Sequence, residues 1–183
     1  MFYLDPQTLK RYTLGTPFTY NGVQYTAAGA THAKFIELGF TQVTVGARPD
    51  SRFYIVTGPD NNGAYNTTAR NLADLKTNFK RQQKEHAHNT LRGTDWYVVR
   101  LAELGVVNGA IPTDVHTFRA AYRTVAGTRC TEIDACTTVQ ELETLITAQA
   151  QLYDINTETY YTNPAALTQW PDELAETYSF SSY

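Results

Sequence analysis

The sequence is poor in charged residues and contains no long apolar run. Charged residues make up 18% of its 183 residues, compared with about 25% in an average soluble domain. The formal net charge is −3, which disfavours a nucleic-acid-binding protein that works through overall basic charge. No stretch approaches the roughly 18 apolar residues of a membrane span. We therefore expect neither a nucleic acid nor a membrane among its partners.

Cysteine is scarce as well. The chain has two, Cys130 and Cys136, and their spacing matches no zinc or redox motif. Six residues along a helix correspond to a rotation of about 600°, so the two thiols point to different sides and are not expected to form a disulfide. Because the first residues also lack the pattern of a secretion signal, we expect a protein made in a reducing cytoplasm.

The patterns that catalysis and metal binding need are also missing. His86 and His88 lie about 200° apart on a predicted helix and cannot share a metal ion, and His32 and His116 have no cysteine or paired carboxylate at ligand spacing. Residues 58–63 resemble a calcium loop but lack its alternating aspartates and distal glutamate. No nucleophile motif or phosphate-binding loop is present. We predict no catalytic residue, no metal and no cofactor, and hence a protein that is not an enzyme.

Threonine and aromatic residues are abundant instead. The chain has 28 Thr, 13 Tyr, 8 Phe and 2 Trp. Aromatic residues are enriched where proteins contact each other. A surface rich in Thr and Tyr and poor in charge therefore indicates a protein bound to neighbouring chains, with a homo-oligomer as one possibility.

Residues 1–70 carry strand and turn patterns, which predict a small β-rich module with a helix. Asn21-Gly22, flanked by aromatic and β-branched residues, is typical of a hairpin with a type I′ turn. Thr31 is placed to cap a short helix that Gly39 ends. The further strands that the pattern predicts are 40–45, 52–57 and 64–68.

At Asn71 the hydrophobic period changes from two to about 3.6, which predicts a helical domain over 71–150. A long helix is expected to about Leu91, and a second is expected to begin at Thr94 or Asp95. The remaining helices are predicted over 113–135 and, after a capping box, from Thr138 through Ile146. Together they indicate a helical hairpin or small bundle.

Residues 151–183 show neither helical nor alternating periodicity and predict an extended aromatic C-terminal tail. Their composition is too apolar for an unstructured linker and matches that of interface hot spots. The residues to which we assign partner binding are Tyr160, Tyr161, Trp170, Pro171, Tyr178, Phe180 and Tyr183. The alternative is that the tail packs on the helical domain of its own chain. With these three parts the expected fold class is α+β.

Four residues are predicted to hold the helices together. Trp96 lies on the apolar face of its predicted helix, which indicates a core position between the first two long helices. Arg119 and Arg123 lie beside each other on the third, four residues apart. We expect them to pair with carboxylates of the preceding helix, Glu103 or Asp95, and direct contact with a partner is the alternative.

One set of short motifs resembles a known family. It combines a long helix, a Thr-Asp-Trp turn, an acidic residue, an aromatic-Arg-x-x-x-Arg helix and a later Trp-Pro pair. The residues that carry it are Arg92-Gly93-Thr94-Asp95-Trp96-Tyr97-Val98-Val99-Arg100, Glu103, Ile111-Pro112, Phe118-Arg119-Ala120-Ala121-Tyr122-Arg123 and Trp170-Pro171. Their order is similar to that in the tail-fibre assembly chaperones and related tail proteins of tailed bacteriophages. In those chaperones the Trp-Pro pair follows the Arg-containing helix closely, whereas more than forty residues intervene here.

The resemblance implies a non-enzymatic structural component of a phage tail, located in the virion and bound to tail-fibre or baseplate proteins. The first alternative is a tail-fibre assembly chaperone, which shields the fibre during assembly and then leaves. A second alternative, from another class, is a small hydrolase or sugar-binding domain, although no acid pair or nucleophile supports catalysis. The long insertion and the aromatic tail favour a protein that stays attached to its partner.

Overall fold

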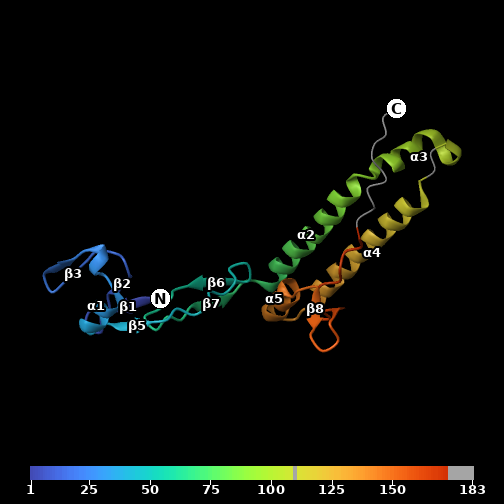
Figure 1. The fold of residues 1–183 in the computed structure, drawn as a ribbon. Coiled ribbons are helices and arrows are strands. Elements are labelled where there is room, and N and C mark those ends of the chain that lie inside the picture. Colours follow the sequence, from blue (N-terminus) through green and yellow to red (C-terminus); the bar gives the residue numbers. More distant parts are fainter. Residues whose placement is uncertain (109–110, 173–183) are drawn as a thin grey trace. The chain divides into compact units, whose positions relative to one another are not determined.

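The computed structural model describes residues 1–108 and 111–172, and the chain divides into two compact units. The first unit is Met1–Arg70, and the second begins at Asn71. The first is rich in short strands and the second in helices (Figure 1). The chain is therefore an α+β protein, as the sequence predicts.

The first unit is built from short antiparallel strands and a helix. A central sheet has the strand order β2–β1–β5, and two hairpins pair β3 with β4 and β6 with β7. The elements are β1 (Phe2–Leu4), β2 (Arg11–Tyr12), β3 (Phe18–Tyr20), β4 (Val23–Tyr25), a 3-10 turn (Ala27–Gly29), α1 (His32–Glu37), β5 (Thr41–Val43), β6 (Tyr54–Thr57) and β7 (Asn66–Ala69).

The hairpin and the helix expected in this unit are confirmed. Asn21 and Gly22 have φ angles of 48° and 77°, the two positive values that a type I′ turn requires. The Thr31 hydroxyl accepts a hydrogen bond from the backbone N–H of Lys34 at 3.2 Å, and Gly39 follows α1 with a φ of 81°. The sequence pattern missed β1, which lies in the middle of the sheet although it has only three residues.

An aromatic core surrounds α1 in the first unit. Phe35 of α1 is fully buried, and its ring centroid lies 4.6 Å from that of Tyr3 in β1. Tyr12 of β2 stacks on Phe40 with centroids 4.8 Å apart, and Phe18 of β3 lies 4.9 Å from Phe35. Ring packing around α1 therefore holds together strands that are too short to be stable as ladders alone.

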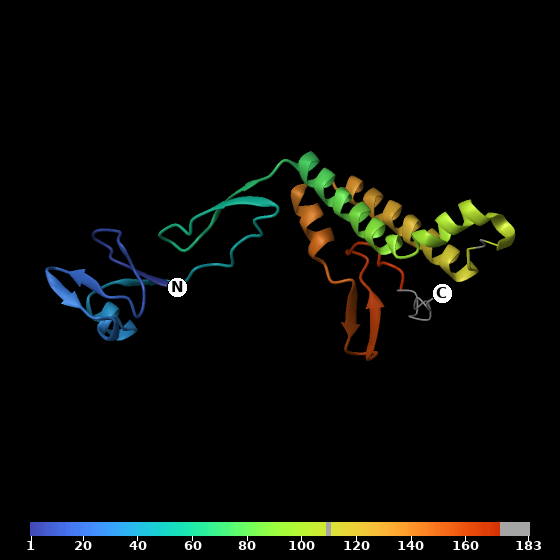
Figure 2. The same ribbon diagram turned by 90° about the horizontal axis from the view of Figure 1, so that it is seen from above.

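The second unit is built on two long antiparallel helices, α2 and α4, which lie side by side in both views (Figures 1 and 2). Gly105, with a φ of 71°, interrupts the regular geometry of α3. The elements are α2 (Leu72–Arg92), α3 (Asp95–Asn108), α4 (Thr113–Ala135), α5 (Val139–Thr147), β8 (Gln151–Asp154) and β9 (Thr159–Thr162). The helices therefore lie where the sequence pattern predicts them.

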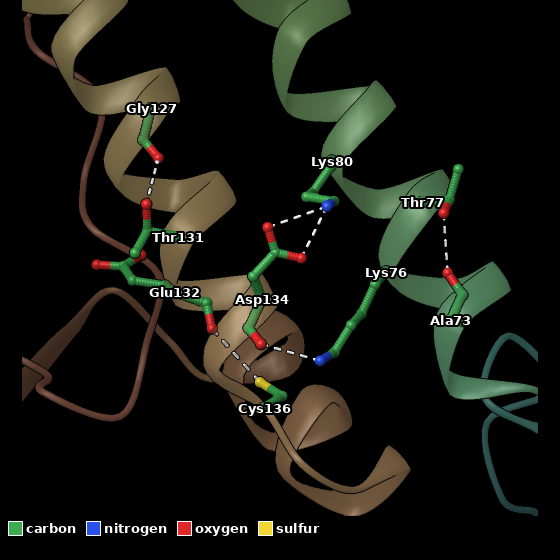
Figure 3. Close-up of polar contacts among 9 residues, drawn as sticks. All are labelled: Ala73, Lys76, Thr77, Lys80, Gly127, Thr131, Glu132, Asp134 and Cys136. Carbon is green, nitrogen blue, oxygen red and sulfur yellow. Dashed lines mark hydrogen bonds and ion pairs between the residues drawn. The ribbon is translucent and has the colours of Figure 1, made fainter.

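Two lysines of α2 bind the C-terminal end of α4 (Figure 3). The ammonium group of Lys80 lies 2.7 Å from a carboxylate oxygen of Asp134, and that of Lys76 donates to the Asp134 carbonyl at 2.9 Å. Carbonyls at the end of a helix carry partial negative charge, so lysine is a favourable partner there. The Thr77 and Thr131 hydroxyls donate to carbonyls four residues earlier, so part of the abundant threonine is satisfied within the helices.

Strands β8 and β9 form a hairpin where the sequence indicated a tail without regular structure. Tyr153 lies opposite Tyr160, and Leu152 lies opposite Tyr161. The expectation of an irregular chain is therefore wrong over 151–162. Because each face of this short hairpin carries an apolar pair, the sequence shows no alternation of apolar and polar residues that could have revealed it.

The capping box of α5 is present, as expected. The carboxylate of Glu141 accepts hydrogen bonds from the backbone N–H groups of Thr137 and Thr138 and from the Thr137 hydroxyl. In return, the Thr138 hydroxyl accepts one from the N–H of Glu141. These bonds, above all the one from the Thr137 N–H, lower the pKa of Glu141 below its ordinary value of 4.5.

This cap makes stability depend on pH. Because folding lowers the pKa of Glu141, its contribution is complete above pH of about 4.5 and is lost as the pH falls through the folded-state pKa. We expect Glu141→Gln to unfold at lower urea concentration than the parent at pH 7, and the difference to shrink as the pH falls from about 4.5 through the folded-state pKa. Urea melts followed by circular dichroism measure this. Glu158→Gln, an equal change of charge at an exposed site of the hairpin, should show no such difference; an equal effect of both variants would contradict the assignment.

Candidate functional site

A polar junction joins the end of α2, the start of α3 and the first half of α4. Its centre is Arg119, which is buried on the inward face of α4. The guanidinium group donates to the Leu91 carbonyl at 3.0 Å, to the Thr94 hydroxyl and to the Asp95 carboxylate at 2.9 Å. The predicted pairing of Arg119 with a carboxylate of the preceding helix is therefore present, and it involves Asp95.

Arg123 and Glu103 do not belong to this junction. Both side chains are exposed, and neither forms an ion pair with another residue in the described part of the chain. Four residues along a helix correspond to a rotation of about 400°, so Arg123 lies about 40° further around α4 than Arg119. It lines a groove between α2 and α4 instead. The prediction that Arg123 and Glu103 form ion pairs between helices is therefore wrong for the described residues.

Trp96 is not a core residue, contrary to expectation. Its side chain is 39% exposed, whereas the neighbouring Tyr97 is buried. Successive residues of a helix point about 100° apart, and the binding of Asp95 to Arg119 sets the rotation of α3 so that Tyr97 faces inward. The Trp96 ring packs on the Tyr97 ring, with 3.8 Å between the two ring centroids. The Arg100 guanidinium lies 5.9 Å from the centroid of the Trp96 ring.

Trp170 packs on the helices of its own chain. It belongs to residues 163–172, which we name the strap because they run back over α2 and α4. The Trp170 ring lies 4.7 Å from His86 of α2 and is stacked 5.3 Å from Tyr122 of α4. The Arg129 guanidinium lies 4.9 Å from its centroid, a cation–π contact.

Hydrogen bonds anchor the strap beside this stack. Arg129 donates to the Thr168 carbonyl and, at 2.8 Å, to the Gln83 side chain. The Glu132 carboxylate accepts from the Thr168 N–H at 3.0 Å and from the Thr168 hydroxyl. Burial lowers the pKa of Arg129, and the nearby Glu132 opposes that shift. Trp170 therefore packs on its own domain, the alternative that the sequence left open, and a role of Trp170 and the adjoining Pro171 in partner binding stays a prediction.

The other tail residues assigned to partner binding have different outcomes. Tyr160 and Tyr161 are 70% and 49% exposed on β9, so their role in binding remains a prediction. The remaining three, Tyr178, Phe180 and Tyr183, lie outside the described residues.

Two exposed apolar surfaces stand out in the second unit. The hairpin surface consists of Tyr153, Ile155, Tyr160 and Tyr161, and the hairpin projects away from the α2–α4 pair (Figure 2). The α3 surface consists of the exposed apolar side chains Trp96, Val98, Val99 and Leu104, of which Val98 lies about 200° around the helix from Trp96. Exposed apolar groups that form a contiguous patch are typical of protein interaction sites. The sequence does hold a signal for the second surface, because apolar residues extend around more of α3 than one buried face requires, although Arg100 and Glu103 interrupt them.

The two tryptophans should differ clearly in their contribution to stability. We expect Trp170→Ala to lower the free energy of unfolding by roughly 1–3 kcal/mol, below the range for a fully buried tryptophan because the ring is half-buried. Trp96→Ala should cost less, about 1 kcal/mol, because Trp96 is more exposed than Trp170 and its ring packs on the adjacent Tyr97. Urea melts followed by circular dichroism measure both. The reverse order would mean that Trp96, and not Trp170, supports the fold.

The described residues hold no group of three or more His, Cys, Asp or Glu side chains arranged to bind a metal ion. Over the same residues, no helix combines the length and the apolar character that crossing a membrane demands. No family model, no curated protein and no solved structure matches this chain.

Proposed function

We propose that the chain is a non-enzymatic structural component of a bacteriophage tail, bound to tail-fibre or baseplate proteins. The observation that carries the proposal is that separate elements of the phage-like motif contact one another. Arg119, from the aromatic-Arg-x-x-x-Arg helix, binds Thr94 and Asp95 of the Thr-Asp-Trp turn. Trp170, from the Trp-Pro pair, stacks on Tyr122 of the same helix. Motifs scattered over some eighty residues thus form one structural unit, which favours a shared origin over chance similarity.

The α3 surface is the part of this unit that we assign to the tail partner. The polar junction fixes the start of α3, and Trp96, Val98 and Val99 then point into solvent. Exposing these apolar side chains to water is unfavourable, and a partner that covers them recovers the free energy. Tryptophan is also among the residues that contribute most to protein–protein affinity.

The test is the composition of purified particles. Virions purified on a density gradient, from a lysate of the phage that encodes the chain, should contain it in fixed ratio to the fibre or baseplate proteins by mass spectrometry. An assembly chaperone would be present in the lysate and absent from the particles. Absence from both would contradict any role in the tail.

A matched pair of variants tests the assigned surface. Val99→Asp in α3 should abolish incorporation into particles, because it places a carboxylate in the apolar contact. Val23→Asp is the control, since the two valines are 54% and 52% exposed and Val23 lies in the other unit. If Val99→Asp is incorporated as well as Val23→Asp, the α3 surface is not the contact.

A further inference from the structure

A groove with positive charge at its rim lies between α2 and α4. Its volume is about 310 Å³, and it is lined by Lys84, Ala87, Arg123, Ala126, Gly127 and Cys130. The small residues leave room for a side chain from outside, and neither the strap nor the hairpin contributes to the lining. Neither Lys84 nor Arg123 forms an ion pair with another residue in the described ranges.

The β8–β9 hairpin has the opposite character, because it is aromatic and acidic. The rings of Tyr153 and Tyr160 lie 5.0 Å apart and are both exposed. Asp154 and Glu158 flank them at the turn, and a hydrogen bond from the Asn156 N–H lowers the pKa of Asp154.

The contrast in charge extends beyond the hairpin and the groove. Residues 130–172 contain seven carboxylates and no Lys or Arg, whereas residues 76–92 contain five Lys or Arg and one carboxylate. The second unit thus contains one acidic and one basic segment, and Lys76 and Lys80 of the basic segment already bind Asp134 of the acidic one. Surfaces of opposite sign that lie apart on one molecule attract each other between copies.

We propose that the chain associates with itself, the β8–β9 hairpin of one copy docking into the α2–α4 groove of a second copy. A tyrosine ring of the hairpin fills the space above the small residues, and Arg123 stacks on the ring face as a cation–π partner. The hairpin carboxylates then lie near Lys84 and Arg123. The contact joins two different surfaces, so it builds a ring or an open row of copies, or a two-fold pair when each copy places its hairpin in the groove of the other. It does not depend on membership of a phage tail.

Analytical ultracentrifugation of the full chain, from low micromolar to several hundred micromolar, tests the contact. The wild type should associate, and less so at high salt, because screening weakens the attraction between charges. The hairpin variant Tyr153→Ser/Tyr160→Ser and the groove variant Lys84→Glu/Arg123→Glu should each associate at least about tenfold more weakly. The control Lys10→Glu/Arg48→Glu makes the same change in net charge in the first unit and should behave as the wild type.

Mixing the two defective variants provides the sharper test. The hairpin variant keeps an intact groove, and the groove variant keeps an intact hairpin, so a mixture should form heterodimers at concentrations where each variant alone is monomeric. A monomeric wild type over the whole range, association of either variant as strong as that of the wild type, or a mixture without heterodimers would each overturn the proposal.

The reactivity of Cys130 measures the contact in the wild-type protein. This measurement therefore does not depend on whether the variants fold. It lines the groove and is half-buried, whereas Cys136 is buried and serves as a measure of integrity. Alkylation of Cys130 by N-ethylmaleimide should slow severalfold as the protein concentration rises, with Cys136 unreactive throughout. A rate for Cys130 that is independent of concentration, in a sample that associates, would place the interface elsewhere and overturn the proposal.

Discussion

Phe35→Ala will destabilise the first unit by about 3–5 kcal/mol, the range for truncating a fully buried aromatic residue. Phe35 has no exposed surface, and its ring contacts Tyr3, Phe18 and Phe40. Its removal opens a cavity at the point where α1 meets the strands. The strands have two to four residues each, so their hydrogen bonds alone cannot compensate for the lost packing.

Amide hydrogen exchange measures the loss of stability in the strands of the first unit directly. Protection of the amides in β1 and β5 should fall in Phe35→Ala and should be unchanged in Ile36→Ala, because Ile36 is the next residue of α1 and is exposed. Both tryptophans lie in the second unit, so tryptophan fluorescence monitors that unit separately and should report the same melt in all variants. Equal protection in Phe35→Ala and Ile36→Ala would contradict the central role of Phe35.

The second large effect is expected for Arg119→Ala, at about 2–4 kcal/mol. The truncation removes an ion pair and two further hydrogen bonds, and it leaves the Leu91 carbonyl and the Thr94 hydroxyl without that partner in a buried place. Asp95→Asn should cost less, about 1 kcal/mol or below, because the Asp95 carboxylate is half in solvent and regains water when the pair is broken.

Urea melts followed by tryptophan fluorescence distinguish these contributions. Arg123→Ala is the matched control, because Arg123 lies one turn further along α4 and is exposed. It should leave the melting curve within about 0.5 kcal/mol of the parent. A loss in Arg123→Ala equal to that in Arg119→Ala would mean that the two arginines act together, as the sequence suggested, and that the junction is not centred on Arg119.

Features that depend on neighbouring residues were predictable from the sequence. The type I′ turn at Asn21-Gly22 and the caps at Thr31 and Thr138 each need only a few consecutive side chains. The helices of the second unit show a hydrophobic period over many residues, so their places were also predictable. The α+β class follows from the order of these local features.

Side-chain direction within a helix could not be predicted in the same way. The apolar pattern of α3 allowed either Trp96 or Tyr97 to face inward, and the ion pair of Asp95 with Arg119 decides between them. That pair joins residues 24 positions apart, beyond the reach of any pattern along one helix. On α4, the rotation of about 40° between Arg119 and Arg123 separates a buried position from one that faces the groove.

The sequence by itself therefore determined the turns, the caps, the helices and the division at residue 70, because hydrogen bonds and hydrophobic periods within a short segment specify them. Only the tertiary structure decided where the aromatic residues of the C-terminal part go. Trp170 lies against His86 and Tyr122, which are 84 and 48 positions away, while Tyr160 stays in solvent on a hairpin. Burial of an aromatic ring depends on which distant surfaces the chain brings to it, and the composition of the ring's own segment carries no information about that.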